Sequence, residues 1–208
     1  MENIDMAVMP IPSSFAYGEE MNVGAYKIAG FGLNVMTGSG AADNNGVSAL
    51  MLTAKDGTSD AVKALLENGA CVNAKDSEGR TALMYAAHNP DFRVTKVLLE
   101  GGASVNARDK KGMTPLMYAA EYNTNPLVIR DLLKARAFVN AKTEDGKTPL
   151  ALAVLRRNPD PSPYIILELL HFGANPDVYI NGRRLECFAK DSPCLRGTRA
   201  LRALRAEN

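Results

Sequence analysis

Two histidines and three cysteines are the residues of this chain best suited to catalysis or metal binding. Neither His88 nor His171 has a cysteine, an aspartate or a second histidine at the spacing of a metal site. Cys71, Cys187 and Cys194 form an odd set that is typical of reduced thiols, although a Cys187–Cys194 disulfide is an open alternative. The H-E-x-x-H, G-x-S-x-G and C-x-x-C motifs are absent. The sequence therefore predicts no cofactor, no metal and no catalytic centre.

A recurring stretch organises the chain and positions its polar residues. It reads GVSALMLTA from Gly46, GRTALMYAA from Gly79, GMTPLMYAA from Gly112 and GKTPLALAV from Gly146. The glycine suits a tight turn with positive φ, and the hydroxyl two residues later can accept from N–H groups at a helix start. Leucine and alanine four residues apart then form one apolar stripe at helical spacing. A second apolar stretch, such as VKALLENGA, predicts a second helix that is closed by glycine.

The copies follow one another at a nearly constant interval. Asp43, Asp76 and Asp109 are 33 residues apart, and the next unit begins at Thr143, 34 residues further on. A period of about 33 residues with a T-P-L helix start resembles the ankyrin-repeat family. The resemblance implies an all-α solenoid of stacked antiparallel helix pairs with projecting β-hairpin loops. Asp76 and Asp109 begin such loops, so turn hydrogen bonding explains their presence.

The resemblance divides the chain into three parts. Residues 1–42 do not match the repeat and are either a glycine-rich N-terminal arm or a degenerate cap. Four ankyrin repeats are expected at residues 43–75, 76–108, 109–142 and 143–178. Residues 179–208 fit a degenerate fifth repeat that acts as the C-terminal cap, because the end of a solenoid needs a polar outer face. Helices are expected near residues 49–55, 59–67, 82–88, 91–100, 115–121, 126–135, 163–171, 184–190 and 195–205.

Two features depart from the family pattern. The family commonly has a histidine after the leucine of T-P-L, where this chain has Met51, Met84, Met117 and Ala151. Adaptable methionine packing is expected to replace part of that polar contact. The other departure is Arg136, which stands where the other units have glycine after the second helix. A left-handed arginine costs on the order of 1 kcal/mol, so Arg136→Gly is predicted to raise thermal stability.

Charge limits the kinds of partner. The net charge is +1, which implies no bulk attraction to nucleic acid, but residues 178–208 hold seven Lys or Arg against three acids. This basic tail is either a solvated cap or a docking site for an acidic partner or an anionic surface. No signal peptide and no membrane-spanning run is evident. A cytoplasmic location is therefore expected, while secretion without a cleaved signal stays compatible with the sequence.

The resemblance implies recognition of a protein partner through hairpin tips and the concave face of the inner helices. Tyr122 beside Met113 is expected to act as an amphipathic anchor, and the mildly basic tips favour an acidic partner. The candidate partner-binding residues are Lys75, Glu78, Arg80, His88, Asn89, Arg108, Lys110, Lys111, Met113, Glu121, Tyr122, Lys142 and Lys147.

The predicted function is therefore a non-catalytic protein–protein interaction module without a small-molecule substrate. Three alternatives remain open from the sequence. One is an effector or inhibitor that binds a larger enzyme or host protein. Another is binding of nucleic acid or an anionic surface through the arginine-rich C-terminal helix. The third is a structural role with self-association through the glycine-rich arm.

Overall fold

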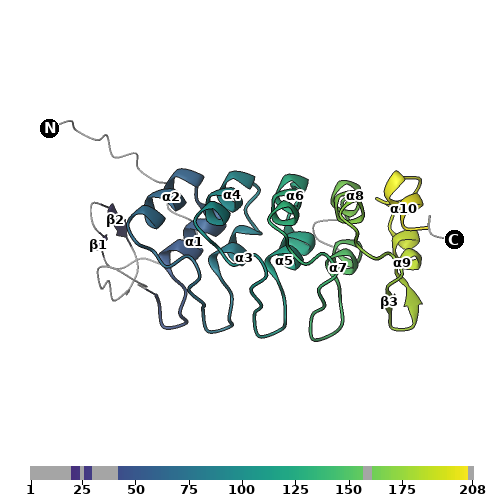
Figure 1. The fold of residues 1–208 in the computed structure, drawn as a ribbon, viewed down its shortest axis with the longest axis horizontal. Coiled ribbons are helices and arrows are strands. Elements are labelled where there is room, and N and C mark those ends of the chain that lie inside the picture. The colour runs from purple at the N-terminus through teal and green to yellow at the C-terminus, as the bar shows by residue number, and fades with distance from the viewer. Residues whose placement is uncertain (1–19, 24–25, 30–41, 157–160, 206–208) are drawn as a thin grey trace.

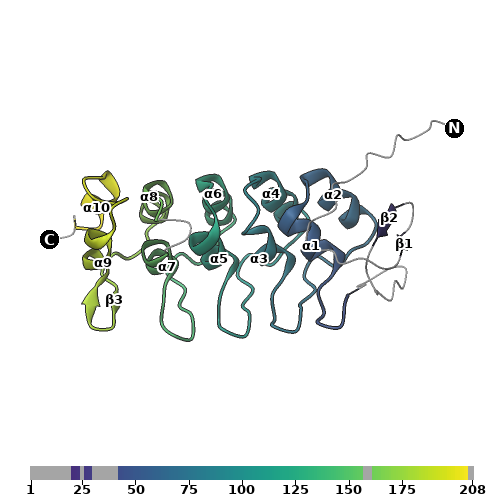
Figure 2. The ribbon, with the colours of Figure 1, turned by 180° about the vertical axis from the view of Figure 1, so that it is seen from behind.

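Helix pairs stack into one elongated row in the computed structural model, which describes residues 20–23, 26–29, 42–156 and 161–205 (Figure 1). The first helices form one layer and the second helices another, and the view from behind shows the same two layers (Figure 2). This arrangement confirms the predicted solenoid. The pairs are α1 (Ala49–Asp56) and α2 (Ser59–Glu67), α3 (Ala82–Ala86) and α4 (Phe92–Glu100), α5 (Pro115–Tyr122) and α6 (Pro126–Lys134), α7 (Pro149–Leu155) and α8 (Pro163–His171), and α9 (Leu185–Asp191) and α10 (Arg199–Ala203).

Two short antiparallel ribbons accompany the helices. Strand β1 (Glu20–Val23) pairs with β2 (Tyr26–Ala29), and β3 (Tyr179–Ile180) pairs with β4 (Arg183–Arg184). The second ribbon projects from α9 on the side where the loops of the other pairs project (Figure 1). Most of residues 1–42 lie outside the described residues, so the choice between an arm and a cap stays a prediction.

Four short loops, called the finger loops below, precede the first helices at residues 43–47, 76–80, 109–113 and 143–147. In the second loop the Asp76 N–H donates to the Arg80 carbonyl at 3.0 Å. The Asp76 carboxylate also accepts from the backbone N–H groups of Glu78 and Arg80 at 2.9 and 2.8 Å. Gly79 has φ +81°, which an L side chain adopts only under strain. The turn role predicted for the aspartates is therefore confirmed.

Hydroxyl caps begin α1, α5 and α7, and methionine sulfur completes two of them. Ser48 Oγ accepts from the Met51 N–H at 3.3 Å, and Met51 Sδ accepts from the Ser48 N–H at 3.4 Å. Thr114 and Met117 repeat the exchange, with both distances at 3.4 Å. This is the geometry of a capping box in which a thioether takes the place of glutamate. Methionine thus contributes a weak polar contact as well as packing.

Three buried polar side chains join each first helix to the one before it. Asn89, Asn123 and Arg156 occupy equivalent places just after α3, α5 and α7, and each donates to two backbone carbonyls at 2.7–3.2 Å. Each satisfies carbonyls that a helix end would otherwise leave without an intrahelical partner. The acceptors are Ala54 and Gly57 for Asn89, Ala87 and Asn89 for Asn123, and Ala120 and Asn123 for Arg156.

Two predicted helices are shorter than expected. Helix α3 ends at Ala86 because the N–H groups of His88 and Asn89 bond to carbonyls three residues back, which tightens the last turn. His88 therefore lies in the turn after α3, not on the helix. Helix α10 begins at Arg199, not near residue 195, because Gly197 has φ +72° and Thr198 caps the helix.

Candidate partner-binding surface

Hydrogen bonds between tyrosine and aspartate fix the two middle finger loops to the helices that follow them. The Tyr85 hydroxyl donates to Asp76 Oδ2 at 2.8 Å, and the Tyr118 hydroxyl donates to Asp109 Oδ2 at 2.8 Å. The residue equivalent to these tyrosines is Leu52 in the first unit, which cannot form such a bond. We call the loops at residues 76–80 and 109–113 the braced fingers. In each braced finger the first aspartate is therefore bonded to the helix that follows the loop.

The braced finger of Asp76 carries an ion pair between a buried carboxylate and a partly exposed arginine. Asp76 is 6% exposed, and Arg80 Nε donates to its Oδ2 at 2.7 Å. Burial favours the neutral carboxyl, but hydrogen bonds from Arg80 and Tyr85 outweigh it and lower the pKa of Asp76. Burial and the bond to Asp76 raise the pKa of Tyr85 to about 12. The hydroxyl therefore stays protonated and keeps its role as donor at neutral pH.

An aromatic cluster made of His88, Tyr118 and Tyr122 lies beside the braced fingers. The His88 ring stacks on Tyr122, with centroids 4.8 Å apart and an interplanar angle of 18°. Tyr118 lies tilted to both, with centroid distances of 5.9 and 6.1 Å. Tyr122 is 40% exposed. Desolvation of the imidazole and the nearby charge of Lys55 lower the pKa of His88, so the cluster presents a neutral ring at pH 7.

Neighbouring finger loops are bonded to one another. The Lys110 N–H donates to the Glu78 carbonyl at 2.9 Å, which joins the two braced fingers. Side chains add a second set of links, since Lys75 Nζ donates to the Arg108 carbonyl at 3.3 Å and Arg108 donates to the Lys142 carbonyl at 2.9 Å. The loops therefore form a continuous row. We call the surface made by this row and the first helices the finger–helix face.

The architecture agrees with a comparison of the sequence with known families. A model of ankyrin repeats in three copies matches residues 26–109 and 87–180, which is more than half of the chain. The chain belongs to the ankyrin-repeat family. A comparison with curated proteins found no match. Ankyrin repeats are generally protein–protein interaction modules and are typically non-catalytic.

Most of the residues predicted to bind a partner lie on the finger–helix face of this ankyrin array. Those with exposed or half-buried side chains lie in the finger loops, directly before them, or at or just after the ends of the first helices. They are Lys75, Glu78, Arg80, His88, Arg108, Lys110, Lys111, Glu121, Tyr122, Lys142 and Lys147. Their position makes them accessible to a partner and leaves them as candidates.

Two predicted residues are removed from the candidate set because they are buried. Asn89 is 5% exposed and its amide is used by the carbonyls of the preceding unit. Met113 is 8% exposed and packs with Met117 and Leu152. Tyr122 stacks on His88, and the buried Met113 offers almost no surface with which to form an anchor.

The sequence reasoning missed the two bracing tyrosines, Tyr85 and Tyr118. The signal was present, because tyrosine stands nine residues after the first aspartate of the finger in both units. The equivalent position holds Leu52 in the first unit and Leu152 in the fourth. A tyrosine that replaces leucine only in the two middle units, each time nine residues after an aspartate, indicates a hydrogen bond between the two side chains.

The described residues contain no group of three His, Cys, Asp or Glu side chains that could hold a metal ion. None of their helices has the length and apolar character of a membrane span. The Cys187–Cys194 disulfide that the sequence left open is not formed.

Proposed function

We propose that this ankyrin-repeat chain is a non-catalytic module that binds a protein partner through the finger–helix face around α3 and α5. The observation that carries the proposal is the aromatic cluster of His88, Tyr118 and Tyr122 beside the two braced fingers. Tyrosine is strongly enriched among the residues that dominate interface energy, because its ring is large and its hydroxyl tolerates water.

Preorganisation is the proposed mechanism. The braces, the bonds between loops and the buried asparagines hold the contact side chains before a partner arrives. Binding to such a surface orders few groups, so less conformational entropy is lost on association. The face needs no movement of the backbone to present its aromatic rings.

Charge around the cluster supports an acidic partner. Lys110 and Lys111 are exposed at the tip of the third finger loop, and Lys55 lies close enough to His88 to affect its pKa. Positive side chains at the rim of an interface accelerate the encounter with a negative surface and suppress positive competitors. We propose a cytoplasmic protein with an acidic surface patch as the partner.

A capture experiment with matched variants tests the proposal. The full chain, Tyr122→Ala and the charge reversal Lys110→Glu with Lys111→Glu are used as baits in lysate of the native cell. Tyr164→Ala is the control, because Tyr164 is 71% exposed on α8 and lies outside the face. Proteins lost by the first two variants and kept by the control are the expected result.

Calorimetry with a captured protein then measures how much each variant weakens binding. Truncation of a central aromatic anchor costs about 2 kcal/mol or more, which is a loss of about 30-fold in affinity. Tyr164→Ala should leave the affinity within about twofold. If Tyr122→Ala and the charge reversal retain every partner, the finger–helix face is not the binding surface.

A further inference from the structure

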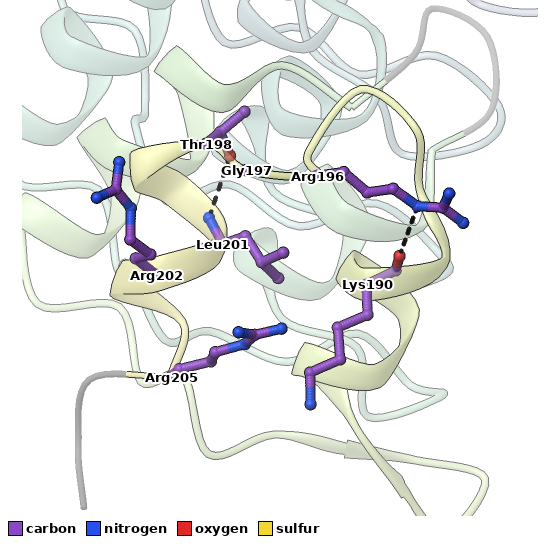
Figure 3. A pocket seen from close by; sticks show the side chains of 7 residues that line it. All are labelled: Lys190, Arg196, Gly197, Thr198, Leu201, Arg202 and Arg205. Carbon is purple, nitrogen blue, oxygen red and sulfur yellow. Dashed lines mark hydrogen bonds between the residues drawn. The ribbon is translucent and has the colours of Figure 1, made fainter.

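A basic pocket lies between α9 and α10 at the C-terminal end of the array (Figure 3). It is an open hollow of about 650 Å³, and its charged lining is formed by Lys190, Arg196, Arg202 and Arg205. Leu201, which is 6% exposed, forms part of its apolar wall. The volume falls in the range of about 300–1,000 Å³ that is usual for ligand-binding sites.

The positive charge of the pocket is only partly neutralised by the residues that the structure describes, because Lys190 is its one ion-paired lining residue among them. The basic residues of the neighbouring ribbon and of α9 are paired, since Arg183 bonds to Asp191 at 3.3 Å and Lys190 bonds to Glu186 at 3.0 Å. Among the described residues, Arg196, Arg202 and Arg205 form no ion pair. Residues 195–205 contain four arginines and no acidic residue.

The arginine side chains spread over both sides of α10 instead of meeting at one point. In Figure 3 the guanidinium group of Arg205 points towards Lys190, whereas that of Arg202 points to the other side of α10. Arg196 Nε donates to the Lys190 carbonyl at 3.3 Å, which positions its guanidinium at the rim. The Thr198 hydroxyl is occupied, because it donates to the Leu195 carbonyl at 2.7 Å and caps the helix.

We propose that this pocket binds an acidic peptide segment of the protein partner, with the side-chain carboxylates of the peptide on the arginines. The proposal rests on the proposed function, because it assigns a second contact to the same partner. Planar guanidinium groups bind carboxylates through two parallel hydrogen bonds. Charges spread over two sides of a helix suit several carboxylates along a peptide better than one compact anion.

Fluorescence anisotropy of a fluorescein-labelled polyglutamate peptide tests the pocket. The full chain is compared at low salt with the double variant Arg196→Gln and Arg205→Gln. Each lost charge contact weakens binding by roughly three- to fivefold, so the double variant should bind at least about tenfold more weakly. Arg205→Lys keeps the charge and should retain most of the affinity.

Two controls separate a site from general electrostatic attraction. Lys63→Gln with Lys96→Gln removes the same charge from exposed positions on α2 and α4, outside the finger–helix face and the pocket. Arg199→Gln removes an exposed arginine of α10 that does not line the pocket. Both should change peptide affinity by less than about twofold. Thermal melts that match the wild type establish that the variants are folded.

Three results would overturn the proposal. The first is that the wild type does not bind the peptide. The second is that the control variants lose as much peptide affinity as the double variant. The third is that phosphatidylserine vesicles or single-stranded DNA bind more tightly than the peptide through the same arginines. The proposed function fails separately. Tyr122→Ala should keep full affinity for the peptide, because Tyr122 does not line the pocket. If the wild type binds the peptide and Tyr122→Ala still captures every partner protein, the pocket proposal stands and the finger–helix face is not the binding surface.

Discussion

The closing turn of α6 offers a direct test of backbone strain in this array. Arg136 has φ 65°, whereas the equivalent positions after α2, α4 and α8 are glycines with φ 83–86°. The hydrogen bonds are the same at all four places. The Arg136 N–H donates to the Leu133 carbonyl at 3.0 Å, as the Gly102 N–H donates to Leu99 at 3.1 Å. One arginine thus occupies a left-handed cap that favours glycine.

The expected effect of Arg136→Gly can be worked out from the structure. A Cβ built on Gly102 or Gly173 meets nothing within 4 Å, so the side chain of Arg136 is not expected to clash. Within the described residues, its guanidinium forms no hydrogen bond or ion pair that the change would remove. Left-handed backbone costs an L residue about 1–2 kcal/mol, and the greater freedom of glycine in the unfolded chain offsets about 0.5–1 kcal/mol.

The net gain in unfolding free energy should be about 0.5–1 kcal/mol. For a chain of 208 residues this corresponds to a rise in Tm of about 1–4 °C. Differential scanning calorimetry measures it directly. Gly102→Arg, the reverse change at the matching cap, should lower Tm by a similar amount.

A third variant distinguishes backbone strain from the arginine charge as the cause of a rise in Tm. Arg136→Ala removes the charge and the long side chain but keeps Cβ, so it should gain almost nothing. A Tm unchanged in Arg136→Gly would refute the strain argument. An equal rise in Arg136→Ala would attribute the effect to lost charge and not to φ.

Three further perturbations test the contacts that hold the array and its face. Asn123→Ala removes the donor for two buried carbonyls and should cost about 2–3 kcal/mol in urea unfolding, whereas a cost below about 1 kcal/mol would show that water replaces the amide. The pKa of Asp76 is lower in the folded state than in the unfolded chain, where it is about 3.9. The ionised carboxylate therefore stabilises the fold above that unfolded pKa, and this stabilisation is lost as pH falls through the folded pKa. Asp76→Asn should therefore be less stable at pH 7 and should lose less stability in acid than the wild type, as measured by unfolding at a series of pH values. Tyr118→Phe keeps the ring but removes the brace, so hydrogen exchange should accelerate in residues 109–113 and stay unchanged in residues 143–147.

Helix boundaries were predictable where local chemistry sets them. The bounds of α2 and α8 agree with the prediction at both ends, since Thr58 caps α2 at its start, Pro163 begins α8, and a left-handed glycine follows each helix. The early end of α3 was not predictable in the same way. Asn89 lies beyond that end and bonds to carbonyls 32 and 35 residues away, and only the stacked array brings those groups together.

The candidate surface was predictable in position but not in detail. The repeat register places the finger loops, so residues such as Lys110 and Lys111 fall on the exposed tips as expected. Met113 occupies an equally exposed place in the pattern. It is buried because Leu152 of the following unit packs against it. When a side chain is buried by a neighbouring unit, the residues around it in the sequence do not predict that burial.

Tyr118 connects rigidity with recognition in a way that explains why the proposed site lies in the middle of the array. Its hydroxyl is bonded to Asp109 of a finger loop, while its ring lies against His88 and Tyr122. The same side chain therefore fixes the loop and forms part of the surface. The unit that contains Leu152 has no hydroxyl at this position, so its finger lacks the brace that a preorganised contact requires. A partner that binds the aromatic cluster thus meets the two loops whose geometry is already set.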